Sequence, residues 1–217
     1  MRGFEKPGSV LTWLAASLAI VATLVPASVA RADDWPQWMG PQRDGVWRET
    51  GIFDRFPEDG PRVVWRQPIR AGYAGPAVAA GRVYVLDREA ATDDDGNPIA
   101  GIDGIPGTER VVCLATDDGT TIWEHEHDCN YDISYPSGPR TTPVIEADRV
   151  HTLGAMGDLL CLDAESGDVR WSRNLAHDFN TKPPVWGWAA HPLLDGNNLI
   201  CLVGGPGSAV VAFDKGT

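Results

Sequence analysis

Short apolar runs alternate with polar turn-forming residues along most of the chain. In the clearest stretch the runs are four to five residues long, which is typical of strands and too short for helices. The predicted strands there are residues 143–147, 150–154, 159–163 and 169–173. Asp, Ser and Gly in the intervening segments predict tight turns. The pattern therefore favours an all-β protein of short antiparallel strands.

An 11-residue motif recurs at a spacing of 48 residues. It runs from Cys113 to Trp123 and again from Cys161 to Trp171, and a third copy begins at Ala212 and reaches Thr217. A Pro-led strand precedes each copy. Periods of about 40 to 50 residues with about four strands each are typical of β-propeller blades. The Gly at position 7 and the Trp at position 11 are Gly119, Trp123, Gly167 and Trp171.

The composition agrees with this fold. The chain holds 24 Gly, 17 Pro and nine Trp, which suits many turns and few helices. The repeated Gly is expected to supply the positive φ of its turn. The repeated Trp is expected on the outer strand of each blade, where it can fill the gap to the next blade, so we interpret it as structural rather than as a ligand-stacking residue.

The repeat, together with the opening segment Asp34–Gly45, resembles the PQQ-like (quinoprotein-type) β-propeller repeat family, in an exported bacterial subgroup with BamB-like repeats. The resemblance implies a closed ring of about seven or eight four-stranded blades, of which this chain, as an N-terminal fragment, would hold about three. The first copy departs from the family pattern at Ala115 and Asp118. We expect a signal peptide at 1–32, a lead segment at 33–61, a lead strand at 62–69, blades at 70–128 and 137–176, and an incomplete blade at 186–217.

The first 32 residues have the layout of a secretory signal peptide. Arg2 and Lys6 precede the 13-residue uncharged run Trp13–Val25, and Ala30-Arg31-Ala32 provides a cleavage pattern. Export to the periplasm, or secretion, is therefore expected, with no membrane span after cleavage; a retained anchor is the alternative. The formal net charge of −12 argues against partners such as nucleic acid or anionic lipid.

The loops that enter the first strand of each blade are expected to open onto the funnel of the ring. Arg140 could hold a carboxylate or another anion there, or could pair with a neighbouring carboxylate or carbonyl. Trp188 could form an aromatic wall or pack in the core. The candidate funnel residues are Tyr73, Arg140, Trp188 and His191.

Other groups give weaker signals for a metal. His125 and His127 lie two apart on a predicted strand and could ligate a metal, but no third ligand is evident, so surface polarity is the preferred interpretation. The insertion at about 91–109 is Asp-rich without EF-hand spacing, which favours a solvated acidic loop. Cys129 is expected to be the most exposed cysteine, whereas Cys113, Cys161 and Cys201 lie in apolar runs.

Catalysis finds little support, because the chain carries no Gly-x-Ser-x-Gly elbow, HExxH or phosphate loop. Two functions remain open. The first is a non-catalytic scaffold that binds a protein or polymer at the funnel, as a monomeric ring. The alternative, implied by the resemblance, is a PQQ-dependent quinoprotein dehydrogenase with calcium that oxidises an alcohol or sugar. No residue of this chain corresponds to a catalytic base or cofactor ligand of such enzymes.

Overall fold

The computed structural model describes residues 3, 32–51 and 54–217. The chain divides into Met1–Arg31 and Ala32–Thr217. Nearly all of the first part, and with it the predicted signal peptide, lies outside the described residues. Within the described part, no helix is both long and apolar enough to cross a bilayer.

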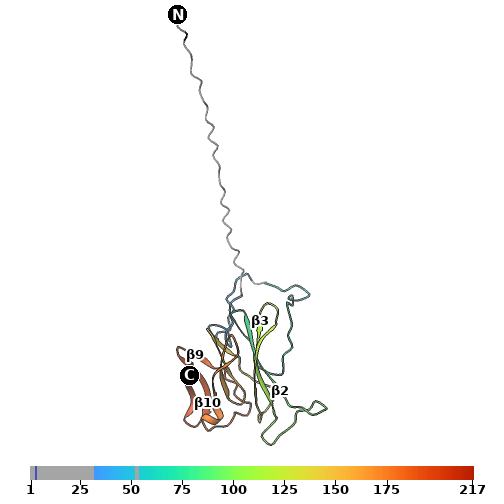
Figure 1. The fold of residues 1–217 in the computed structure, drawn as a ribbon, viewed down its shortest axis with the longest axis vertical. Coiled ribbons are helices and arrows are strands. Elements are labelled where there is room, and N and C mark those ends of the chain that lie inside the picture. The colour runs from blue at the N-terminus through green and yellow to red at the C-terminus, as the bar shows by residue number, and fades with distance from the viewer. Residues whose placement is uncertain (1–2, 4–31, 52–53) are drawn as a thin grey trace. The chain divides into compact units, whose positions relative to one another are not determined.

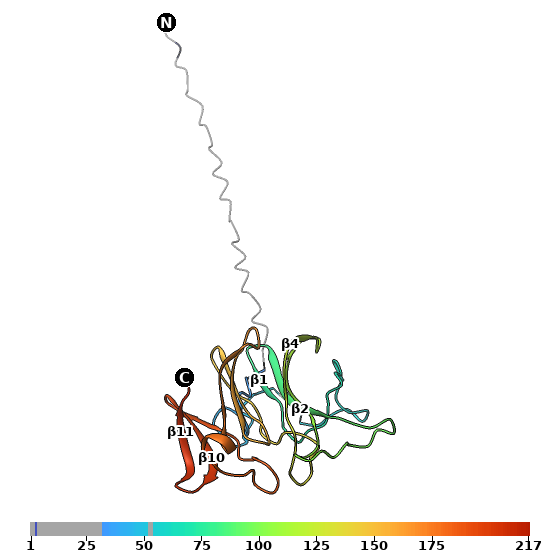
Figure 2. The ribbon, with the colours of Figure 1, turned by 60° about the horizontal axis from the view of Figure 1, so that its bottom comes forward.

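Residues from 77 onward form three antiparallel sheets, and each sheet uses strands in sequence order (Figures 1 and 2). The predicted all-β fold with blade-like sheets is confirmed. The only helix among the described residues is the single turn α1, Leu175–Asp178. The first sheet contains β1 Ala77–Ala79, β2 Arg82–Ala90, β3 Gly107–Ala115 and β4 Thr121–Asp128; the second contains β5 Val144–Glu146, β6 Arg149–Leu153, β7 Asp158–Asp163 and β8 Val169–Asn174; the third contains β9 Leu193–Asp195, β10 Asn198–Gly205 and β11 Ser208–Asp214.

Two expectations about strand positions need correction. Residues 62–69 form no strand, because their backbone has no ladder partner among the described residues. The insertion in the first blade is shorter than expected. Gly107–Glu109, which the sequence placed in the acidic loop, are the first residues of β3 and pair with the end of β2.

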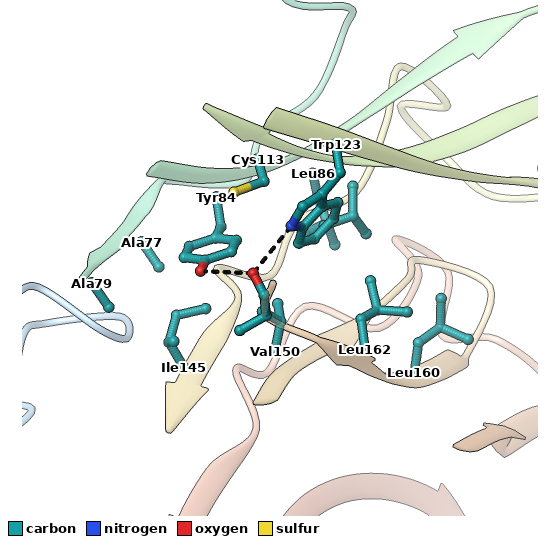
Figure 3. Close-up of a cluster of buried hydrophobic side chains, with 12 residues drawn as sticks. Ala77, Ala79, Tyr84, Leu86, Cys113, Trp123, Ile145, Val150, Leu160 and Leu162 are labelled. Atoms are coloured by element: carbon teal, nitrogen blue, oxygen red, sulfur yellow. Dashed lines mark hydrogen bonds between the residues drawn. The ribbon is translucent and has the colours of Figure 1, made fainter. Parts of the chain in front are cut away.

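The first and second sheets pack face to face through one buried cluster (Figure 3). Alternate residues of β2 and β3, such as Tyr84 and Cys113, point into it, and Val150 and Leu162 of the second sheet meet them. The opposite face of the first sheet buries a second set of side chains under Trp65. A strand buried on both faces has an almost continuous apolar sequence, which explains runs such as Val83–Leu86.

Each repeated Trp contacts the glycine turn of the following sheet. The Trp123 indole Nε1 donates to the Ala164 carbonyl at 3.1 Å, and its ring covers Gly167, where an added Cβ would lie 2.6 Å from the ring. Trp65 makes the same pair of contacts one sheet earlier, with the Thr116 carbonyl and Gly119. Trp171 likewise donates to the Lys215 carbonyl of the third sheet. Gly167 has a φ of 79°, so the turn itself favours glycine.

The opening segment Asp34–Gly45, here called the N-terminal strap, runs along the first strands of the sheets. Trp35 exchanges two backbone hydrogen bonds with Val78 on the free edge of β1, and the Pro36 carbonyl accepts from Ile145 of β5. At the third sheet, the Arg43 guanidinium donates to the carbonyl of Pro192, just before β9. The strap therefore covers strand edges that would otherwise be open to pairing.

Candidate functional site

Three loops that enter β1, β5 and β9 are hydrogen-bonded to one another. The amide of Tyr73 donates to the Pro139 carbonyl at 2.9 Å, and the amide of Ser134 donates to the Val185 carbonyl at 2.7 Å. We call this area the loop surface, and we define it by its exposed large side chains and by the arginine that organises it. Its members are Tyr73, Tyr135, Arg140, Val185 and Trp186.

Arg140 organises the loop surface through backbone carbonyls. Its guanidinium donates to the carbonyls of Gly138, Ser134 and Tyr135. The same group lies 5.2 Å from the centre of the Tyr73 ring. Of the two interpretations drawn from the sequence, the structure places Arg140 in the second, pairing with neighbouring carbonyls. Arg140 therefore holds the loop in place, and its guanidinium N–H groups bond to these three carbonyls.

Tyr135 is held in an unusual backbone conformation. Its φ is 54°, in the left-handed region that a residue with a Cβ adopts at a cost of about 1 kcal/mol or more. The Arg140 guanidinium accounts for this, since it donates to the Tyr135 carbonyl at 2.6 Å. The side chain of Tyr135 is 69% exposed and that of Trp186 is 61% exposed. A fixed backbone thus presents two aromatic side chains to solvent.

Two of the predicted funnel residues are placed differently from Tyr73 and Arg140. Trp188 is 2% exposed and packs in the core between the second and third sheets, with its indole Nε1 donating to the Val203 carbonyl. It therefore forms no aromatic wall; Trp186, two residues earlier, is the exposed one. His191 stacks on Trp38 of the strap at 4.6 Å between ring centres, and its Nδ1 accepts from the Thr142 amide.

The residues at the loops do not fit calcium. Calcium takes about six to eight oxygen ligands, chiefly carboxylates and carbonyls. Tyr73, Arg140 and His191 offer a phenol, a cation and an imidazole, and the guanidinium already occupies three carbonyls. We therefore derive no step through PQQ or calcium at these positions.

His127 occupies a buried polar cluster and not the polar surface expected from the sequence. Its side chain is 24% exposed and lies at the interface between the first and second sheets. The donor atoms of Glu109 and Cys129 lie within 4.8 Å of the His127 ring nitrogen, whereas His125 is outside this cluster. Cys129 is 6% exposed, which makes it the most exposed of the four cysteines, as expected, although all four are buried. Its amide donates to the Gly107 carbonyl and continues the β3–β4 ladder past the end of β4.

Burial shifts the pKa values in this cluster. Burial raises the pKa of the Glu109 carboxyl, although the Tyr131 hydroxyl and His127 oppose the shift. Burial also raises the pKa of the Cys129 thiol, with the Glu109 and Asp158 charges adding to the effect. For His127, burial disfavours the cation, but the carboxylates of Asp158 and Glu109 outweigh it and raise the pKa.

The sequence missed two members of this cluster. Glu109 was assigned to an acidic loop, yet it faces His127 directly across the β3–β4 pair. Asp158 was assigned to a turn, yet it begins β7 in the next sheet. The usable signal was the spacing of His127 and Cys129, which places both on one face of an extended segment.

A sequence profile described as outer membrane protein assembly factor BamB matches residues 107–217. That span covers half of the chain and contains the second and third sheets with β3 and β4. The chain belongs to the PQQ-like β-propeller repeat family. The resemblance inferred from the glycine–tryptophan repeat is thereby confirmed, and the three sheets are blades of that fold.

Three solved structures are similar to parts of this chain. Quinohemoprotein alcohol dehydrogenase from Comamonas testosteroni superposes with a TM-score of 0.52 at 19% identity, over 81% of this chain and 24% of that one. Quinohemoprotein alcohol dehydrogenase ADHIIG from Pseudomonas putida HK5 gives 0.43 at 18% identity, over 72% and 21% of the two chains. BamB from Moraxella catarrhalis gives 0.35 at 20% identity, over 69% and 47%. No curated protein matches the chain in sequence.

The similarity to the Comamonas testosteroni dehydrogenase shows that the two proteins share the β-propeller fold, and it shows nothing about activity. The chain spans about a quarter of the length of that dehydrogenase. The fold hosts both enzymes and assembly factors, so activity has to be argued from the residues of this chain.

Proposed function

We propose that this protein is an exported, non-catalytic scaffold that binds a protein partner through the loop surface. The observation that carries the proposal is a pair of exposed aromatic side chains, Tyr135 and Trp186, on two loops that are hydrogen-bonded to each other and held at Tyr135 by Arg140. Tyr, Trp and Arg are the residue types enriched at the energetic centres of protein interfaces.

The loop surface is organised before any partner arrives. Hydrogen bonds between its loops and the guanidinium of Arg140 fix the backbone around Tyr135. A surface that loses little freedom on binding keeps more of its contact energy as affinity. Export follows from the predicted signal peptide, and the family profile, whose description names an outer membrane factor, supports the same compartment.

The test has two steps. A photo-crosslinking amino acid placed at Tyr135 or Trp186, in cells that export the protein, is expected to yield one defined product whose partner is identified by mass spectrometry. With that partner purified, the double variant Tyr135→Ala/Trp186→Ala is expected to bind about thirtyfold more weakly or worse, which corresponds to about 2 kcal/mol.

The matched control removes exposed apolar side chains elsewhere. Ile99→Ala/Ile102→Ala acts on the inserted loop of the first blade, where both side chains are exposed. It is expected to leave the affinity unchanged. Equal loss of binding in the two double variants, or the same crosslinked product from position 102, would contradict the proposal.

A further inference from the structure

Three potential metal ligands of the first blade lie close together at its interface with the second blade, and a fourth from the second blade lies beside two of them. The donor atoms of Glu109, His127 and Cys129 all lie within 4.8 Å of one another. Asp158 of the next blade joins them, with its Oδ2 3.6 Å from the Cys129 Sγ and 3.8 Å from the His127 Nε2. The Glu109 Oε2 is also 3.8 Å from that nitrogen.

Strand register explains why these side chains converge. Glu109 of β3 lies directly opposite His127 of β4, so both point to the same face of the sheet. Cys129 follows His127 by two positions, and its amide bonds to the Gly107 carbonyl, which continues the alternation past the end of β4. This face is the one packed against the second sheet, where Asp158 begins β7.

Each carboxylate is held by one oxygen and leaves the other directed at the cluster. Glu109 Oε1 accepts from the Tyr131 hydroxyl and from the Ala155 amide, which leaves Oε2 toward His127. Asp158 Oδ1 accepts from the Asn174 side-chain amide at 2.8 Å, which leaves Oδ2 toward His127 and Cys129. Outer hydrogen bonds that orient ligand side chains in this way are typical of metal sites.

Space for the Glu109 carboxylate depends on Gly154. An added Cβ at Gly154 would collide with Glu109 Oε2, the oxygen that faces the cluster. The glycine therefore lets a charged group enter a position that is otherwise enclosed by backbone. The packing of the surrounding backbone therefore fixes the position of this carboxylate.

In the part of the chain that the structure describes, the His127 ring is unpaired at the centre of the cluster. Neither of its nitrogens has a hydrogen-bond partner among the described residues, and both are shielded from solvent. Buried polar atoms are nearly always paired, and an unpaired one calls for an explanation such as an ion. The carboxylate oxygens at 3.8 Å are too far for hydrogen bonds and are at the spacing of two ligands of one metal.

Three of the donor-atom distances are close to those of a tetrahedral transition-metal site. Metal–ligand distances of about 2.0 to 2.3 Å at tetrahedral angles place neighbouring donor atoms about 3.3 to 3.8 Å apart. The sulfur–oxygen distance of 3.6 Å falls in this range, and the two nitrogen–oxygen distances of 3.8 Å lie at its upper limit. Asp158 is outside the group whose donor atoms all lie within 4.8 Å of one another, so binding of one ion by all four residues requires the Asp158 and Glu109 carboxylates to move closer together. One thiolate, one imidazole and two carboxylate oxygens suit zinc and do not suit calcium, which takes oxygen ligands only.

We propose that Glu109, His127, Cys129 and Asp158 bind one zinc ion that links the first and second blades. On binding, the Cys129 thiol gives its proton to solvent and its sulfur bonds the metal. His127 and Asp158 also line an open hollow of about 380 Å³, whose wall includes Asn174, Asp178 and the cation Arg173. The ion acts as a structural cross-link at the end of the interface away from Trp123.

Zinc titrated into chelator-treated protein tests the site. Calorimetry is expected to give one zinc per chain, and thermal unfolding is expected to shift to higher temperature on adding zinc. Cobalt in place of zinc is expected to give the visible absorption of a tetrahedral ion and a thiolate charge-transfer band. His127→Gln and Cys129→Ser are each expected to weaken zinc binding at least tenfold, and Cys129→Ser to abolish the charge-transfer band.

His125→Gln is the matched control, since it removes a histidine two residues away on the same strand, outside the cluster. It is expected to bind zinc and gain thermal stability as the parent protein does. Because the His127 side chain is partly exposed, His127→Gln is expected to fold even if Cys129→Ser does not. Absence of stoichiometric zinc in the parent protein, or equal binding by His125→Gln and His127→Gln, would overturn the proposal.

Discussion

Replacing Trp123 by alanine is expected to lower the free energy of unfolding by about 3 to 5 kcal/mol. The indole fills the cluster between the first two blades, and its Nε1 donates to the Ala164 carbonyl (Figure 3). The variant leaves a cavity beside Tyr84 and also leaves Gly167 without the ring that covers it. Urea unfolding followed by circular dichroism measures the loss.

Trp47→Ala is the control for this change. Trp47 is 56% exposed on the segment that follows the strap, so the same truncation removes far less buried surface than Trp123→Ala does. It is expected to change the free energy of unfolding by less than about 0.5 kcal/mol. Similar losses for the two variants would show that Trp123 does not hold the blades together.

Replacing Asp87 by alanine is expected to cost about 3 to 5 kcal/mol of stability. Asp87 is fully buried, and both of its oxygens accept from the Arg110 guanidinium, at 3.0 and 2.6 Å. Oδ2 also accepts from the amide of Arg70. The variant leaves a largely buried guanidinium with one remaining acid, Glu124, which accounts for the large effect. Thermal and urea unfolding both report it.

Two further variants distinguish the cost of an unpaired buried charge from the cost of losing an ion pair. Asp44→Ala breaks the exposed pair with Arg48 and is expected to cause no measurable change, since solvent already screens that pair. Asp87→Leu/Arg110→Leu removes both buried charges and is expected to recover part of the stability lost in Asp87→Ala. A double variant that is less stable than Asp87→Ala would contradict this explanation.

Local pattern was enough to predict the repeat and its strands. In the second blade, predicted strands at 150–154 and 159–163 compare with Arg149–Leu153 and Asp158–Asp163. Residues 62–69 have the same apolar pattern, yet they form no strand, since a strand also requires a neighbour to pair with. The pattern shows which residues can be extended, and tertiary pairing decides which of them form a sheet.

The environment of the polar side chains was harder to predict, because their contacts depend on strand register and on the neighbouring blade. His127 acquires its partners through Glu109, which pairs with it across β3 and β4, and through Asp158 from the next blade. Neither relation can be read from spacing along the chain. Trp186 and Trp188 illustrate the same limit, since two residues separate an exposed aromatic side chain from a buried one.

The loops of this propeller are proposed to present a surface for a protein partner and not to form a cofactor site. The most direct measurement is a titration of PQQ with calcium into the exported protein, isolated as the cell makes it, followed by calorimetry and by dye reduction with alcohol or sugar substrates. If the loops bind a protein and no cofactor, neither saturable binding nor dye reduction is expected. Saturable binding accompanied by substrate-dependent dye reduction would show that the propeller is a quinoprotein enzyme.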